Sequence, residues 1–400
     1  MRVTSLPIIA TLLAAVACSD ESAVGPDTPG LAGYPRLLRH LPAGAVDQLI
    51  HLAGGTDLLE GIAVDPQGTI YLSNRHRIGD QRVSEIRAIA ADNRQSVFAV
   101  LDTGGVHEFD GGVVGLAVDH RGDVYAALAV EDDARRGVWR IGRDRRPERL
   151  PGSAGMRTPN ALTFDAGGDL YITDSDDGTI WRFPRTGAGA LWLRHPLLAH
   201  APGFGVGANG ILFRPPRTLF VANTEQGLIA RIPIERSGAP GEPHVVASGP
   251  ELVTVDGLAI DPQGFICAAI VFGGVGGPAP VVRVDPATGG VEPLTDQWDA
   301  FDFPTSLVFG SGRRGPWELY VVNSGAFAAA GMFRSWSTSP GIRCAQDCGG
   351  QPCCSPWPCS CRPNAWWRKR WRARSSCSTR AASPSLFASS SGHSSSGTRG

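Results

Sequence analysis

The sequence lacks the features that mark membrane-spanning and helical proteins. Past residue 17, no apolar run is long enough to cross a bilayer. Lysine occurs once, at Lys369, and methionine three times, against 51 glycines and 31 prolines. Many short strands joined by Gly-rich and Pro-rich turns produce this composition, whereas a helical bundle does not. The composition therefore favours an all-β fold.

An excess of positive charge is also missing from most of the chain. The formal net charge is −1, but Ser335–Gly400 carries nine Arg or Lys against one Asp, and the N-terminal leader adds Arg2. Subtracting +8 for the tail and +1 for the leader leaves −10 for residues 18–334. An acidic body disfavours nucleic acid as a partner and is compatible with a bound cation.

Cysteine is scarce in the body and concentrated in the C-terminal tail, which holds seven of the nine. This odd number, without a repeated CxxC pair, disfavours both a disulfide knot and a zinc cluster. The tail also has no apolar periodicity from which to build a core. We expect residues 335–400 to be disordered. A reading-frame shift just after Arg334 would produce the same bias toward Arg, Cys, Ser, Trp and Pro, and resequencing the gene would test that hypothesis.

The N-terminus has the pattern of a bacterial export signal. Arg2 provides a positive start, Leu6–Ala17 is apolar but too short to span a bilayer, and Ala15–Ala17 presents small residues at a cleavage site. Cys18 follows directly, as in the lipobox of bacterial lipoproteins; a secretory signal cut after Ala17 is the alternative. Residues 18–45 are polar and Pro-rich, which predicts a flexible tether. We expect an exported protein of the periplasm or cell envelope, attached to a membrane only through lipid on Cys18.

A repeated motif organises residues 46–334. The stretch LLEGIAVDPQGTIYLSN returns as VGLAVDHRGDVYAAL, NALTFDAGGDLYITD, NGILFRPPRTLFVAN and DGLAIDPQGFICAAI, and more weakly as TSLVFG followed by ELYVVN. The equivalent first positions are Glu60, Val114, Asn160, Asn209, Asp256 and Thr305, spaced by 54, 46, 49, 47 and 49 residues. Such a period is typical of a propeller or a solenoid. Each unit contains period-two apolar runs divided by turns, which predicts a six-bladed β-propeller with four-stranded blades.

The two ends of the ring are predicted to join. The sixth unit supplies three strands, SLVFG, ELYVVN and GMFR, up to Arg334. The segment VDQLIHLAGG at 46–55 occupies the place that an outer strand takes before each later unit. We therefore predict that this N-terminal segment pairs as the outermost strand of the last blade.

The first position of each repeat is the expected site of chemistry. The innermost strand of a blade begins at the mouth of the central channel, so these positions form one ring, and the turns DPQG, DHRG and DAGG lie at the opposite face. Four members, Glu60, Asn160, Asn209 and Asp256, carry side-chain oxygens. Converging carboxylate and amide oxygens suit Ca²⁺, which takes six to eight oxygen ligands. Turn capping explains any single Asn or Asp, but it does not readily explain a glutamate in the same register.

These motifs resemble the regucalcin and gluconolactonase family of six-bladed propellers, also called the senescence marker protein family. EGIAVD, PNALTFDAGGDLYITD, ANGILF, VDGLAIDPQG and FPTSLVFG with ELYVVN occur in the family's order, over about residues 46–334. The resemblance implies that Glu60, Asn209 and Asp256 hold a divalent cation, which is Ca²⁺ or else Zn²⁺, Mg²⁺ or Mn²⁺. It implies that Asn160 contacts the ion or the substrate. The implied substrates are small lactones or related esters.

The implied reaction is metal-assisted hydrolysis, in which the cation polarises the carbonyl and Asp256 is the general base or the nucleophile. Ile62-Ala63 stand where the family usually has Pro and an aromatic residue, which predicts a reshaped pocket floor. His107 and His200, in loops that open on the same mouth, are candidate substrate-binding residues; a solvated loop histidine is the alternative for each. Cys267 occupies an apolar strand position and is expected in the core.

Two other functions fit the same architecture. A non-enzymatic propeller, like those built from NHL repeats, would use the mouth to bind a protein, glycan or peptidoglycan partner. A metal-free member resembling strictosidine synthase would use the channel for condensation chemistry, although Glu60, Asn209 and Asp256 disfavour it. Melting with EDTA and then with calcium separates a cation-dependent hydrolase from a binding module. The sequence leaves the natural substrate and the oligomeric state open.

Overall fold

The computed structural model describes residues 46–51, 58–78, 81–104, 111–203, 205–273, 279–295, 301, 303–324 and 331–337. The expected signal peptide, Cys18, the tether, His107 and the tail beyond 337 lie outside these residues. Within them, the chain forms strands and two one-turn 3-10 helices, η1 (Ser153–Gly155) and η2 (Pro250–Leu252). The prediction of an all-β fold is confirmed. None of the helices in these described segments is long and apolar enough to cross a membrane.

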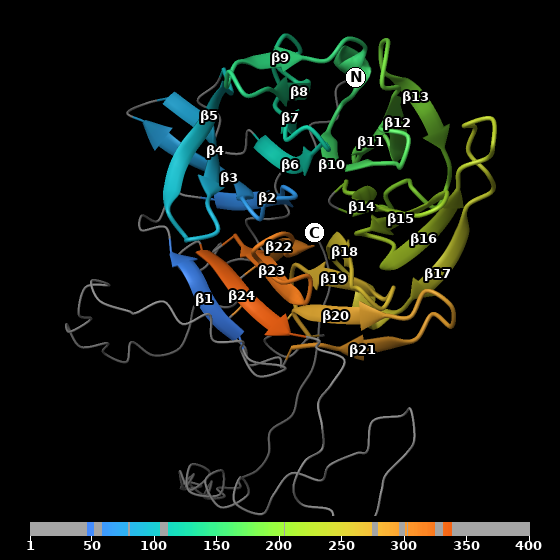
Figure 1. The fold of residues 1–400 in the computed structure, drawn as a ribbon. Coiled ribbons are helices and arrows are strands. Elements are labelled where there is room, and N and C mark those ends of the chain that lie inside the picture. The colour runs from blue at the N-terminus through green and yellow to red at the C-terminus, as the bar shows by residue number, and fades with distance from the viewer. Residues whose placement is uncertain are drawn as a thin grey trace, which may run out of the picture. The chain divides into compact units, whose positions relative to one another are not determined.

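The strands form six four-stranded antiparallel sheets around a central axis, which is a β-propeller (Figure 1). Five of the sheets are built from four consecutive strands, and the chain enters each of them at its innermost strand. The first sheet contains β2 (Leu58–Val64), β3 (Ile70–Ile78), β4 (Gln81–Ile89) and β5 (Gln95–Asp102), and the second contains β6 (Gly112–Val118), β7 (Val124–Ala129), β8 (Gly137–Ile141) and β9 (Pro147–Arg149). The third sheet contains β10 (Pro159–Phe164), β11 (Leu170–Asp174), β12 (Thr179–Phe183) and β13 (Ala190–Arg194), and the fourth contains β14 (Ala208–Arg214), β15 (Thr218–Asn223), β16 (Leu228–Pro233) and β17 (His244–Ser248). The fifth sheet contains β18 (Val255–Ile260), β19 (Ile266–Ile270), β20 (Val281–Val284) and β21 (Val291–Pro293).

The sixth sheet joins the two ends of the propeller. It consists of β22 (Pro304–Phe309), β23 (Glu318–Asn323) and β24 (Gly331–Ser337), with β1 (Val46–His51) as its outermost strand. Strand β1 pairs antiparallel with β24, and the innermost strand β22 contacts both β18 and β2. The predicted role of the N-terminal segment is therefore confirmed. Strand β24 continues three residues beyond the predicted boundary at Arg334, because β23 still offers backbone partners to Ser335 and Ser337.

The hydrophobic core lies between neighbouring sheets. The interface of the fourth and fifth sheets, for example, packs Phe220 and Ile229 against Leu258 and Ile270, all buried. Alternating residues of each strand face opposite sides, so each inner strand supplies apolar side chains to both neighbours. Cys267 on β19 is fully buried in the next interface, and its predicted place in the core is confirmed.

A buried arginine fastens the sixth sheet to the first on the face where the predicted turns lie. Arg314, in the β22–β23 connection, is 5% exposed. Its Nε donates to the Gly68 carbonyl at 2.9 Å, and its Nη2 donates to the Ala90 carbonyl at 2.7 Å. The guanidinium also lies 5.2 Å from the ring centroid of Tyr320. The ring is thus held by side-chain bonds as well as by the β1–β24 pairing, and the sequence pattern did not predict this contact.

Replacing this arginine is expected to loosen the ring. In Arg314→Ala, two buried carbonyls lose their donor, which costs about 2–4 kcal/mol of unfolding free energy and lowers the melting temperature by roughly 5–10 °C. The matched control is Arg94→Ala, because Arg94 is 83% exposed and pairs with Asp92 at the surface; its effect should stay within about 0.5 kcal/mol. Equal melting temperatures for the two variants, measured by calorimetry, would contradict the fastening role.

Candidate metal centre

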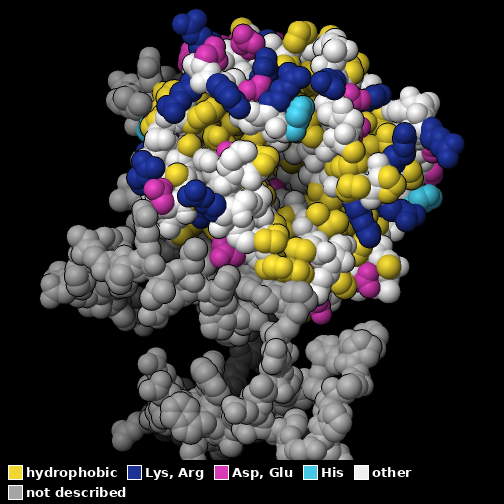
Figure 2. Space-filling view, viewed as in Figure 1, with side chains coloured by type: hydrophobic (Ala, Val, Ile, Leu, Met, Phe, Trp, Pro, Cys, Tyr) yellow, Lys and Arg dark blue, Asp and Glu magenta, His cyan; other side chains and the backbone are white. Residues whose placement is uncertain are grey.

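Each innermost strand contains a β-bulge at the residue that begins the repeated motif. In all six inner strands the register against the second strand shifts at this position, for example between Leu59 and Ile62 in β2 and between Val255 and Leu258 in β18. A bulge inserts an extra residue into one strand and re-aims its side chain. The bulged positions all line one central cavity of about 420 Å³: Glu60, Val114, Asn160, Asn209, Asp256 and Thr305. Figure 2 shows the ring hollowed at its centre. The structure therefore brings the predicted ring of residues together.

Glycines beside the bulges allow the inner strands to approach one another at the axis. A Cβ atom on Gly210 would lie 2.1 Å from the Asp256 carbonyl oxygen, and one on Gly115 would lie 2.1 Å from the Asn160 carbonyl oxygen. No side chain fits at such a distance, so the residue after the bulged one must be glycine in the motifs VG and NG. This close approach is what brings the donors of successive sheets to one cavity.

Hydroxyl groups directly after the second strands β11 and β15 decide which way the two asparagine amides face. The Ser175 hydroxyl donates to the Ala208 carbonyl at 2.7 Å, so it can only accept from Asn160 Nδ2, which lies at 3.0 Å. The Thr224 hydroxyl likewise donates to the Val255 carbonyl at 2.8 Å and accepts from Asn209 Nδ2 at 3.0 Å.

Each amide nitrogen is thereby held toward its hydroxyl, which leaves the amide oxygen for the cavity. Asn209 is 5% exposed, and its Oδ1 is buried without a hydrogen-bond partner. A buried carbonyl oxygen without a partner costs free energy, and a ligand that binds it removes that cost.

Two carboxylate residues line this cavity, and burial raises the pKa of both. Burial, and then the charge of Glu60, hold the pKa of Asp256 well above its usual range, against the opposing effect of a hydrogen bond from Asn209. Burial also raises the pKa of Glu60, while Arg75 partly offsets the shift. A like charge nearby and removal from water both disfavour ionisation. A cation between them would stabilise both ionised forms.

One guanidinium contacts a cavity-lining residue without being part of the lining. Arg75, on β3, donates from Nη2 to Glu60 Oε2 at 2.8 Å, and about a fifth of each side chain is exposed, 22% and 21%. In the repeat, Arg75 occupies the register position that Ser175 and Thr224 occupy in the third and fourth sheets. The residue that orients the donor is therefore a hydroxyl beside each asparagine and an arginine beside Glu60.

The donor set fits a hard divalent cation. Two carboxylate residues and two asparagines line one cavity, and among the described residues Asn209 Oδ1 is buried without a hydrogen-bond partner. Across the residues that the structure describes, no three His, Cys, Asp or Glu side chains gather into a metal-binding group. A cation here would thus depend on asparagine oxygens, which Ca²⁺ accepts more readily than metals that prefer nitrogen or sulfur. Glu60, Asn160, Asn209 and Asp256 are the residues that would hold it.

Of the two predicted histidines, the structure describes only His200. It is not among the cavity-lining residues; its side chain is 41% exposed and its Nδ1 lies 2.9 Å from the Ala201 carbonyl. His195, 23% exposed, accepts the Leu197 amide through Nδ1 at 3.2 Å. Local loop bonds account for both geometries, and His107 lies outside the described residues. A substrate contact by either His107 or His200 stays a prediction.

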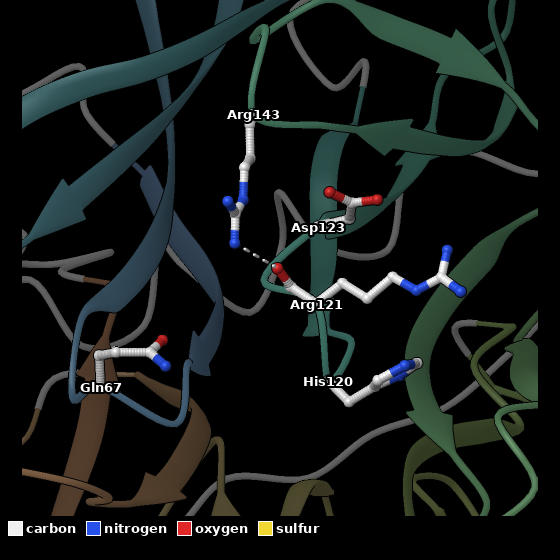
Figure 3. A pocket seen from close by; sticks show the side chains of 5 residues that line it. All are labelled: Gln67, His120, Arg121, Asp123 and Arg143. Atoms are coloured by element: carbon white, nitrogen blue, oxygen red, sulfur yellow. Dashed lines mark hydrogen bonds between the residues drawn. The ribbon is translucent and has the colours of Figure 1, made fainter.

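A second hollow lies on the opposite face, among the turns of the first and second sheets. Figure 3 shows its lining, Gln67, His120, Arg121, Asp123 and Arg143, with Arg143 reaching the Arg121 carbonyl at 3.4 Å. The Asp123 carboxylate is taken by Arg140 Nη2 at 2.5 Å. The predicted turn at this face is present, because Asp119 Oδ1 accepts the amides of Arg121 and Asp123. Turn structure accounts for this hollow, and the central cavity is the better candidate.

These features define a β-propeller whose central cavity gathers carboxylate and amide oxygens. Residues 203–324, which include Asn209 and Asp256, match the family model described as the SMP-30/gluconolactonase/LRE-like region. The resemblance inferred from the sequence motifs is confirmed over this segment. No curated protein sequence matches the chain.

Solved structures share the fold at low sequence identity. A candidate gluconolactonase is 18% identical, with a TM-score of 0.52 over 74% of this chain and 93% of that one. A gluconolactonase from Xanthomonas campestris is 20% identical, with a TM-score of 0.51 over 72% and 88%. An auxiliary nutrient binding protein from Bacteroides thetaiotaomicron is 12% identical, with a TM-score of 0.52 over 73% and 76%. At these identities the likeness establishes the propeller fold alone.

Proposed function

We propose that this protein is a divalent-cation-dependent hydrolase of the gluconolactonase type, with Ca²⁺ as the favoured ion and a lactone or related ester as substrate. The observation that carries the proposal is the orientation of the two asparagine amides. Ser175 and Thr224 hold the amide nitrogens, so both amide oxygens are left for the cavity that Glu60 and Asp256 line. In the described residues Asn209 Oδ1 is buried without a hydrogen-bond partner, and a bound cation would satisfy it.

The protein groups have distinct roles in such a reaction. A bound divalent cation supplies Lewis-acid polarisation of the ester carbonyl and stabilises the negative charge that develops on its oxygen. Asp256, placed in the same cavity, is the group that would accept a proton from the attacking water. Asn160 is half-buried at the cavity wall and is positioned to bind the substrate.

Cation binding is expected to stabilise the folded protein measurably. After EDTA treatment, Ca²⁺ at a hundred times its dissociation constant should add about 2.7 kcal/mol to the unfolding free energy, because the unfolded chain has no assembled site. For a domain of this size the melting temperature should rise by roughly 5–10 °C. Asn209→Leu should remove most of the shift. His200→Ala should retain it, since His200 lies outside the cavity lining.

Hydrolysis of γ-butyrolactone and of an aryl ester, assayed in the same samples, completes the test. Activity that disappears with EDTA and returns with the cation supports the proposal. An unchanged melting temperature together with no hydrolysis by the wild type would overturn it and would favour a propeller that binds a partner at the same mouth.

A further inference from the structure

We propose that Arg75 makes the central cavity select substrates that carry a carboxylate. This inference deepens the proposed function and rests on it. Among the described residues, the charged side chains that line the cavity are Glu60 and Asp256, and the guanidinium of Arg75 lies 2.8 Å from Glu60. The three groups together carry a net charge of −1 when ionised.

A divalent cation changes the sign of this small site. Adding +2 to −1 leaves +1, in a cavity whose remaining lining is apolar, amide or hydroxyl and carries no charge. Partly buried charge without a counter-charge is unfavourable, so the loaded cavity is expected to prefer a ligand with one negative charge over a neutral one. In a site with two carboxylates and no arginine, the same cation would reach neutrality and carry no such preference.

The geometry of Arg75 is suited to this role. Its Nη2 bonds to Glu60, but its Nε is buried without a hydrogen-bond partner, so the guanidinium is not saturated. Its aliphatic stem lies against the backbone at Gly112, where a Cβ atom would come within 2.5 Å of the arginine Cδ. Gly112 lies two residues before Val114 on β6, so the stem runs near the ring position beside Glu60 that offers no oxygen donor. A carboxylate there would meet the guanidinium fork, which matches it in shape and charge.

Arginine in this register also distinguishes the first sheet from the others. The matching position holds Ser175, Thr224 and Ser324 in the third, fourth and sixth sheets, Ala129 in the second and Val271 in the fifth. A hydroxyl would have sufficed to orient Glu60, as Thr224 orients Asn209. The extra positive charge is therefore better explained by a ligand than by the fold.

Two binding constants test the inference, because Arg75 should affect them in opposite directions. Isothermal titration would measure Ca²⁺ alone, and then, in saturating Ca²⁺, 4-hydroxybutyrate against the uncharged 4-hydroxybutyramide, which has no lactone to open. In Arg75→Gln, Ca²⁺ affinity should rise at least threefold, because a neighbouring positive charge is gone. The affinity for 4-hydroxybutyrate should fall about tenfold while that for 4-hydroxybutyramide changes less than twofold. Arg75→Lys should lie between the wild type and Arg75→Gln in both constants.

Arg87→Gln is the matched control. Arg87 lies on β4 of the same sheet and pairs with Glu85 at 3.1 Å, away from the cavity lining. Its loss should leave all three constants within twofold of wild type. If Arg75→Gln weakens both Ca²⁺ and 4-hydroxybutyrate, Arg75 merely holds Glu60 in place and the inference is wrong. If the wild type binds Ca²⁺ but does not favour the carboxylate, this inference alone fails; absence of Ca²⁺ binding overturns the proposed function as well.

Discussion

Asp256→Asn is expected to reduce hydrolysis about a thousandfold, and yet to melt at a higher temperature than the wild type when no cation is present. The loss follows because an amide neither accepts the proton from water nor supplies the second negative charge of the cation site. The gain follows because the charge of Asp256 is disfavoured in the folded protein by burial and by Glu60. Residues placed for function often reduce stability in this way.

The pH dependence of this gain has a defined sign. The folded-state pKa of Asp256 is raised above its ordinary value of 3.8, so the folded state binds the proton more tightly than the unfolded chain does. The contribution of Asp256 to the unfolding free energy of the wild type is therefore fully present below pH 3.8, and it is lost as the pH rises through the folded-state pKa. In EDTA, the melting temperatures of the wild type and Asp256→Asn should therefore be similar near pH 4, and that of Asp256→Asn should be higher near pH 8. A variant that melts lower than wild type at pH 8, or that keeps its activity, would contradict this role.

Gly210→Ala is expected to damage fold and site together. Its Cβ would lie 2.1 Å from the Asp256 carbonyl oxygen and 3.0 Å from Gly257 Cα, and both contacts are with backbone. Inner strands β14 and β18 must then separate, which costs about 3 kcal/mol of unfolding free energy, in the range of overpacked cores. Because Asn209 and Asp256 lie on either side of this contact, the cation-dependent rise in melting temperature should shrink as well.

The control for this variant is Gly315→Ala. A Cβ atom on Gly315 would have nothing within 4 Å, and this glycine has no positive φ, so alanine there should change the unfolding free energy by less than about 0.5 kcal/mol. Denaturant unfolding with and without Ca²⁺ would measure both quantities. Wild-type stability and cation response in Gly210→Ala would show that the close approach of the inner strands does not assemble the site.

The architecture was predictable because its signals are local and repeated. Alternating apolar residues and Asp-x-x-Gly turns recur at a near-constant period, so each sheet predicts the next. The ring of donors was predictable for the same reason, since Glu60, Asn160, Asn209 and Asp256 share one register. The β-bulges place these four residues at the same level of the central cavity. The sequence signals the bulges only through the glycines that follow three of these residues.

Contacts between distant segments were not predictable from the repeat. The hydrogen bonds of Arg314 to the carbonyls of Gly68 and Ala90 join residues more than two hundred positions apart, and no local sequence pattern predicts them. The role of Arg75 left a weak signal, because it replaces the hydroxyl residue found at the same place in other repeats. Aligning the second strands as carefully as the first would have identified it. A substrate contact by His200 stays a prediction, because its side chain is not among those lining the cavity and its Nδ1 lies 2.9 Å from the Ala201 carbonyl.

The most direct test of the account is a crystal structure of the protein soaked with Mn²⁺, with the ion located by its anomalous scattering. The account predicts one peak in the central cavity, about 2.1–2.6 Å from side-chain oxygens of Glu60, Asn209 and Asp256, with Asn160 at or near the same distance. The peak should be absent from crystals of Asp256→Asn. An ion bound elsewhere, or an empty cavity at saturating Mn²⁺, would contradict the claim that these oxygens form a cation site.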